Sequence, residues 1–88
     1  MDSNIIIEDI KKYIENNILS SDVKIDAATN LQQAGMDSFS IVEIILFIER
    51  QYGVMIPDDK LVPDNFKTLQ ALASTVKEIM DHNNKSTT

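Results

Sequence analysis

Apolar residues recur every three or four positions in three separate stretches of this chain. The first stretch contains Ile7, Ile10 and Ile14, and the other two cover residues 41–52 and 69–79. A repeat close to 3.6 residues places such side chains on one face of an α-helix, where they can be buried together. The sequence therefore predicts amphipathic helices that share one apolar core.

The first helix is expected over Ser3–Leu19, with Asp2 or Ser3 as its N-cap. The apolar period is then lost over Ser20–Asp37, where Asp, Thr, Asn and Gly separate isolated apolar residues. We expect a long loop there, anchored to the core by Leu31. Loops of this length are uncommon in compact domains and often carry function.

The second helix is expected to begin at Asp37 or Ser38 and to end near Tyr52, before the helix-terminating Gly53. At about 100° per residue, its apolar side chains fall on two faces. The face predicted to join the core consists of Ile41, Ile44, Ile45, Ile48 and Tyr52. The opposite face consists of Phe39, Val42, Glu43, Leu46, Phe47 and Arg50.

A short third helix is expected within Asp58–Phe66, with Pro63 in its first turn and Leu61, Val62 and Phe66 carried into the core. Thr68 is a suitable N-cap for a last helix, whose apolar period continues to Met80.

Together these elements predict an all-α fold: a small four-helix bundle with three main helices, one short third helix and a long loop between helices 1 and 2. One domain is expected over residues 1–81, followed by a polar, disordered tail over residues 82–88. The expected core consists of Ile7, Ile10, Ile14, Leu31, Ile41, Ile45, Ile48, Tyr52, Ile56, Leu61, Phe66, Leu69, Leu72 and Val76.

The charge and composition of the chain exclude several classes of function. The formal net charge is −6 with a single Arg, which argues against nucleic acid as a partner because phosphate binding needs clustered basic residues. Cys is absent, so disulfides and thiolate metal sites are excluded, and the chain suits a reducing cytoplasm. No apolar stretch approaches the length of a membrane span. Asp58, Asp59 and Asp64 lack the spacing of a calcium loop, so we expect no metal site.

Ser38 is the residue with the clearest chemical potential. It follows the loop and opens a strongly apolar helix, where unpaired N–H groups and the positive end of the helix dipole favour an anion on its oxygen. Ser38 or Asp37 could also serve simply as the N-cap. A catalytic triad is disfavoured, because the surrounding sequence is not G-x-S-x-G and the only His, His82, lies in the polar tail.

The segment Gly35-Met36-Asp37-Ser38-Phe39 resembles the G-x-D-S-L attachment signature of acyl, peptidyl and related carrier proteins. The resemblance extends from about Ile6 to Ile79. It includes Val42-Glu43-Ile44, Glu49, Tyr52-Gly53-Val54-x-Ile56-Pro57 and Asn65-Phe66-x-Thr68-Leu69. The chain looks most like the free-standing carriers of specialised pathways.

The resemblance implies that a phosphopantetheinyl transferase, with coenzyme A and a divalent cation, attaches phosphopantetheine to Ser38. Asp37 is then the neighbouring acid that the transferase and its metal ion meet. The arm would hold an acyl or aminoacyl group as a thioester, delivered by a loading ligase and passed to synthase or transferase enzymes. Fatty-acid, polyketide and nonribosomal-peptide pathways all use such carriers. The chain itself would be a cytoplasmic, monomeric carrier with no catalytic residues.

A helix that is apolar on two faces can bury only one of them in the core of its own domain, so the other face is available to a binding partner. We expect a partner-binding face formed by Phe39, Val42, Glu43, Leu46, Phe47, Glu49 and Arg50. Ser40 and Arg50 stand where carriers of fatty-acid synthesis usually have carboxylates, so apolar contact is expected to weigh more than charge in partner selection.

Four alternatives remain open. The loop could cover this face, or the face could form a homodimer contact. The chain could also be a helical adaptor that binds partners through Phe39, Val42 and Leu46 without any covalent modification. A hydrolase that uses Ser38 is the least favoured alternative, because no base lies near Ser38 in the sequence.

Overall fold

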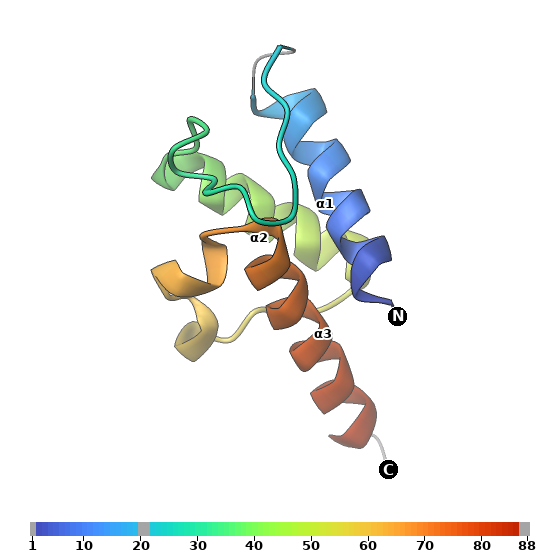
Figure 1. The fold of residues 1–88 in the computed structure, drawn as a ribbon. Helices are drawn as coiled ribbons and strands as arrows, with labels where there is room; N and C mark the ends of the chain where they lie inside the picture. Colours follow the sequence, from blue (N-terminus) through green and yellow to red (C-terminus); the bar gives the residue numbers. More distant parts are fainter. Residues whose placement is uncertain (1, 20–21, 87–88) are drawn as a thin grey trace.

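The computed structural model describes residues 2–19 and 22–86, and within them every regular element is helical. The elements are the α-helices α1 (Ser3–Asn17), α2 (Ser38–Tyr52) and α3 (Leu69–Ser86), and the 3₁₀ helices η1 (Asp58–Lys60) and η2 (Pro63–Phe66). Figure 1 shows α1 and α3 against each other, with α2 crossing behind them. The predicted all-α bundle with three main helices is confirmed.

The helices begin and end where the capping residues predict. The Asp2 carboxylate accepts the Asn4 amide at 2.9 Å, and the Thr68 hydroxyl accepts the Ala71 amide at 3.0 Å. Gly53 ends α2 in the left-handed region at φ 64°, a conformation that glycine adopts without steric cost. α1 is two residues shorter than expected, since it ends at Asn17 and Ile18 is its C-cap.

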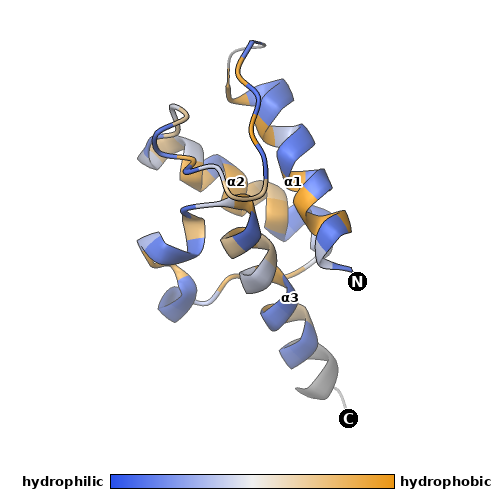
Figure 2. Cartoon of the chain, viewed as in Figure 1, coloured by the Kyte–Doolittle hydropathy of each residue, from blue (hydrophilic) through white to orange (hydrophobic). Residues whose placement is uncertain are grey.

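The core lies between the three α-helices. Of the expected core residues, those that are buried are Ile10, Ile14, Leu31, Ile48, Ile56, Phe66, Leu69, Leu72 and Val76. Those that are half-buried and pack against this core are Ile7, Ile41, Ile45 and Tyr52. Buried apolar residues outside the expected set are Ile6, Ile25, Met36, Ile44, Val54, Ala73 and Ile79. Figure 2 shows α2 apolar over much of its length, in contrast to the mixed colours of α1.

The short third helix differs from the prediction. Two separate 3₁₀ turns, η1 and η2, take its place, and Leu61 and Val62 lie at the bend between them with 42% of each side chain exposed. The expectation that both enter the core is wrong, because the chain bends between the two turns instead of continuing as one helix that could direct both side chains to the core. Only Phe66 is buried there.

The loop between α1 and α2 is attached to the rest of the bundle by backbone hydrogen bonds. The Leu31 amide donates to the Lys67 carbonyl at 2.8 Å, and the Gln70 amide donates to the Ala27 carbonyl at 3.1 Å. Leu31 itself is fully buried, which confirms its anchoring role. The long loop, green and cyan in Figure 1, is therefore held against the start of α3.

The polar C-terminal stretch also differs from the expectation. α3 continues through Ser86, so the segment expected to be a disordered tail is helical over residues 82–86, and residues 87–88 lie outside the described part. Once a helix is nucleated, each further residue adds a backbone hydrogen bond at little cost in free energy. A helix can therefore continue beyond the last residue of its apolar face. No helix within the described residues is both long and apolar enough to cross a membrane.

Candidate functional site

The turn before α2 brings residues 37 and 38 to the surface. Gly35 has a φ of 115°, which favours glycine, and the Met36 amide donates to the Leu31 carbonyl at 3.1 Å. The Met36 side chain is 3% exposed. With Met36 anchored in the core, the next two residues emerge at the edge of the bundle.

Asp37 is the N-cap of α2. Its Oδ1 accepts the Ser40 amide at 2.9 Å and the Ser40 hydroxyl at 3.1 Å. These two hydrogen bonds, that of the amide first, lower the pKa of the Asp37 carboxyl below its ordinary value of 3.8. The Asp37 side chain is therefore an ionised carboxylate on the surface at neutral pH.

Ser38 is the first residue of α2 and is exposed. Because Asp37 supplies the cap, the question of which residue caps the helix is answered, and the Ser38 hydroxyl is not needed for that purpose. Ser38 lies at the N-terminal end of α2, where unpaired backbone N–H groups favour a negatively charged group. The position combines an accessible oxygen with a rigid attachment point.

A pocket of about 300 Å³ lies beside Ser38. It forms where the loop, the start of α2 and η2 meet. Its lining residues are Gln32, Met36, Asp37, Ser38, Ile41, Pro63, Phe66 and Lys67. Gln32, Pro63 and Lys67 were not singled out from the sequence as site residues, because the folded chain alone brings them beside Ser38. The pocket offers apolar walls to a group attached to the Ser38 oxygen.

Most of the expected partner-binding face is indeed on the surface. The exposed fraction of Phe39 is 72%, and those of Val42 and Leu46 are both 53%. Arg50 is exposed, whereas Glu43 and Glu49 are half-buried. Glu49 also has a structural role, since its Oε2 accepts the Ile56 amide at 3.2 Å and fixes the segment that leaves α2. The loop therefore leaves Phe39, Val42 and Leu46 uncovered.

Phe47 and Ser40 lie elsewhere than expected. The Phe47 ring stacks on the Tyr13 ring with 4.2 Å between centroids, so it is half-buried against α1 rather than part of the exposed face. Ser40 is 9% exposed and turned toward Asp37. A carboxylate at position 40 would therefore face the Asp37 carboxylate instead of a partner.

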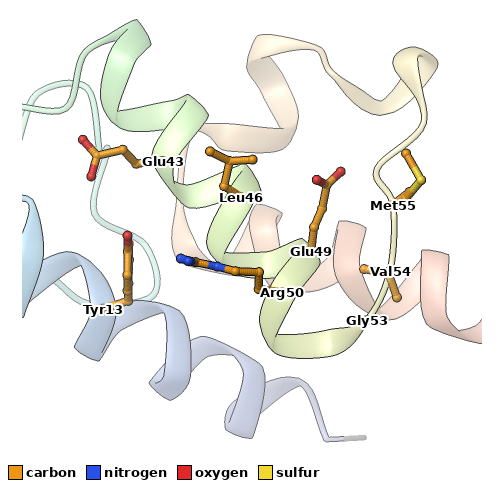
Figure 3. A pocket seen from close by; sticks show the side chains of 8 residues that line it. All are labelled: Tyr13, Glu43, Leu46, Glu49, Arg50, Gly53, Val54 and Met55. Atoms are coloured by element: carbon orange, nitrogen blue, oxygen red, sulfur yellow. The ribbon is translucent and has the colours of Figure 1, made fainter.

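A groove of about 480 Å³ lies along the second half of the exposed face. Figure 3 shows Leu46, Glu49 and Arg50 on α2 between Tyr13 of α1 and Met55. Met55 is 80% exposed, while its neighbours Val54 and Ile56 are buried. The segment that leaves α2 after Gly53 is extended, and side chains in such a segment point to opposite sides in turn, so the opposite orientation of Met55 follows from the burial of Val54 and Ile56.

Replacing Asp37 by Ala is expected to lower the melting temperature by about 4 °C at neutral pH, because the cap of α2 is lost. Asp37→Asn should retain most of the cap, since Asn is an equally good N-cap. A carboxyl with a lowered pKa stabilises the fold above its unfolded value of 3.8 and loses that contribution as the pH falls through the folded value. The gap in melting temperature between wild type and Asp37→Ala should therefore close in acid, whereas Asp37→Asn, whose amide does not titrate, should keep its advantage over Asp37→Ala. A constant gap between wild type and Asp37→Ala below pH 3.8 would contradict this role.

Comparisons with known proteins identify the family of the chain. The family described as "Phosphopantetheine attachment site" matches residues 9–76. The chain is 32% identical over 73 residues to aminoacyl carrier protein 1 of Bradyrhizobium diazoefficiens, covering 83% of this chain and 79% of that protein.

Two solved structures have the same fold. One is a chain in the structure of Bradyrhizobium japonicum glycine:[carrier protein] ligase complexed with its cognate carrier protein, with 28% identity, a TM-score of 0.69 and coverage of 86% of this chain and 96% of that one. The other, the acyl carrier protein of Thermotoga maritima, is similar in fold at 16% identity, with a TM-score of 0.74 and coverage of 93% and 94%.

The family pattern covers most of the chain and includes the loop, the start of α2 and the pocket beside Ser38. The family expected from the sequence, and phosphopantetheine as its cofactor, are thereby confirmed. The chain belongs to the phosphopantetheine attachment-site family, whose members tether acyl or aminoacyl groups as carrier proteins.

Proposed function

We propose that Ser38 carries the phosphopantetheine arm and that the chain presents aminoacyl groups to partner enzymes. The observation that supports this most strongly is the exposed Ser38 hydroxyl in the first turn of α2. Asp37 caps the helix, so the Ser38 hydroxyl is not used for capping. When bound, the arm supplies a terminal thiol that holds the cargo as a thioester. The chain supplies the attachment point and the surfaces that partners recognise.

The residues around Ser38 fit such an arm. Met36, Ile41 and Phe66 give the pocket apolar walls, and its volume of about 300 Å³ leaves room for a flexible chain beside them. Asp37 uses one oxygen, Oδ1, for the cap. We propose that its other oxygen meets the metal ion of the phosphopantetheinyl transferase, for which an ionised carboxylate is a suitable ligand.

We propose that the chain catalyses no reaction itself. Its only histidine, His82, lines a different pocket together with Lys60 and Glu78, so it is not placed to activate Ser38. A hydroxyl nucleophile needs a base within hydrogen-bonding reach. A carrier needs none, because its contribution is to raise the effective concentration of the cargo at other active sites. A cytoplasmic location and a monomeric state belong to the same proposal.

The aminoacyl cargo is favoured by the similarity to aminoacyl carrier protein 1 and to the carrier bound to a glycine ligase. The test is to mix arm-bearing protein with ATP, an amino acid and a glycine:[carrier protein] ligase, and to detect a thioester by intact mass and by its cleavage with hydroxylamine. Transfer of the amino acid would support the proposal. Transfer of acyl groups alone, from an acyl-loading enzyme, would identify a fatty-acid or polyketide carrier instead.

Partner enzymes are proposed to dock on Phe39, Val42, Leu46 and the adjoining groove with Glu43, Glu49 and Arg50. Leu46→Glu should lower kcat/KM for loading by a cognate enzyme about tenfold or more, because a charge would be buried in an apolar contact. Ile5→Glu on α1 is the matched control, since Ile5 and Leu46 are both 53% exposed. Equal loss of loading in both variants would place docking elsewhere.

A further inference from the structure

Lys67 is the one basic residue among the eight that line the pocket beside Ser38. The pocket is otherwise formed by apolar and neutral side chains and by the Asp37 carboxylate. A lysine stem can lie along an apolar surface while its ammonium group stays in water. Lys67 is therefore placed to meet whatever is attached to the Ser38 oxygen.

A phosphodiester on Ser38 would have an unfavourable electrostatic environment without such a cation. The preceding residue, Asp37, is an ionised carboxylate, and the whole chain has a formal net charge of −6. The positive N-terminal end of α2 favours an anion. The Asp37 carboxylate already lies there as the N-cap, so its negative charge weakens the attraction of that end for a second anion. Without a counter-charge, the arm would be repelled from the surface of the bundle.

The backbone of Lys67 is held in place while its side chain is only weakly engaged. Its carbonyl accepts the Leu31 amide at 2.8 Å, and the preceding Phe66 is buried in the core. Its ammonium group lies 3.1 Å from the Asp64 carboxylate, but the two side chains are 60% and 83% exposed. An ion pair with this exposure contributes little to stability, so exchanging it for another partner costs little.

We propose that the Lys67 ammonium group leaves Asp64 and pairs with the phosphodiester of the arm on Ser38. The pair would hold the base of the arm over Ile41 and Phe66 and reduce its freedom before a partner enzyme captures it. Lys67 is thus a positioning residue, and Asp64 competes with the arm for it. This inference rests on the proposed attachment to Ser38.

The test compares the melting temperature of each protein before and after the arm is attached, at low ionic strength, with attachment verified by mass. Loading should raise the melting temperature of wild type by about 2–4 °C more than that of Lys67→Gln. Asp64→Asn should increase the gain from loading, because it removes the competitor. High salt should abolish the difference between wild type and Lys67→Gln.

Lys77→Gln is the matched control, since Lys77 is exposed on α3 and outside the Ser38 pocket. Its gain on loading should equal that of wild type. An equal gain in Lys67→Gln and wild type would overturn the inference while leaving the proposed attachment intact. Failure of wild type to accept the arm on Ser38 would instead overturn the proposed function, and this inference with it.

Discussion

Ser38→Ala protein is expected to gain no phosphopantetheine when it is incubated with coenzyme A, magnesium and a broad-specificity phosphopantetheinyl transferase. The substitution removes the oxygen that would form the phosphodiester, so the loss should be complete rather than partial. Intact mass measures the result directly. The fold should be unaffected, because Ser38 is exposed and the cap of α2 is supplied by Asp37.

Ser74→Ala is the matched control for this experiment. Ser74 is an exposed serine within a helix, but it lies on α3 and outside the pocket beside Ser38. Ser74→Ala protein should be loaded at the wild-type rate. If Ser38→Ala protein were still loaded, the attachment would be assigned to the wrong residue, even though the family is correct.

The second large effect concerns stability. Ile44→Ala should reduce the free energy of unfolding by about 2–5 kcal/mol, because a fully buried side chain is replaced by a cavity between the helices. A domain of this size has a free energy of unfolding of about 5 kcal/mol or somewhat more, so the variant should keep only a small part of it and unfold at a much lower urea concentration than wild type. Urea denaturation followed by circular dichroism measures the change.

Leu46→Ala on the same helix is the control, with 53% of the Leu46 side chain exposed in the wild type. Its free energy of unfolding should fall by about 1 kcal/mol or less. Equal losses in the two variants would mean that the faces of α2 are assigned wrongly. The same result would also remove the basis for a docking surface at Leu46.

The helices were predictable because their boundaries depend on local chemistry. Asp2, Gly53 and Thr68 act on backbone groups within a few residues of themselves, and each has the role expected from its position. The candidate site was predictable for a similar reason, because Asp37 and Ser38 belong to one continuous motif at the end of a loop. Their arrangement is fixed by the turn at Gly35 and Met36 and by the start of α2, all within a few residues of the motif.

Tertiary packing decided what the sequence left open. Ile7 was expected in the core together with Ile10 and Ile14, but its neighbour Ile6 is fully buried and Ile7 is only half-buried. Phe47 could have faced either a partner or α1, and its stacking on Tyr13 settles this. Periodicity gives the faces of a helix, but it does not give the direction from which a neighbour approaches.

The pocket beside Ser38 was beyond prediction for the same reason. Lys67 and Ser38 are far apart in the sequence, and they line one pocket because the loop packs beside the start of α3, where the Leu31 amide donates to the Lys67 carbonyl. Leu61 illustrates the opposite error. It is an apolar residue in an apolar segment, yet it is 42% exposed because the chain bends between η1 and η2.

The most direct test of the central claim is to load the wild-type protein with coenzyme A, magnesium and a broad-specificity phosphopantetheinyl transferase, and to map the product by intact mass and peptide fragmentation. We expect a single phosphopantetheine group, located on Ser38. Addition at another residue would contradict the site assignment. No addition by several transferases, on protein shown to be folded, would contradict the carrier function and favour an unmodified adaptor that binds through Phe39, Val42 and Leu46.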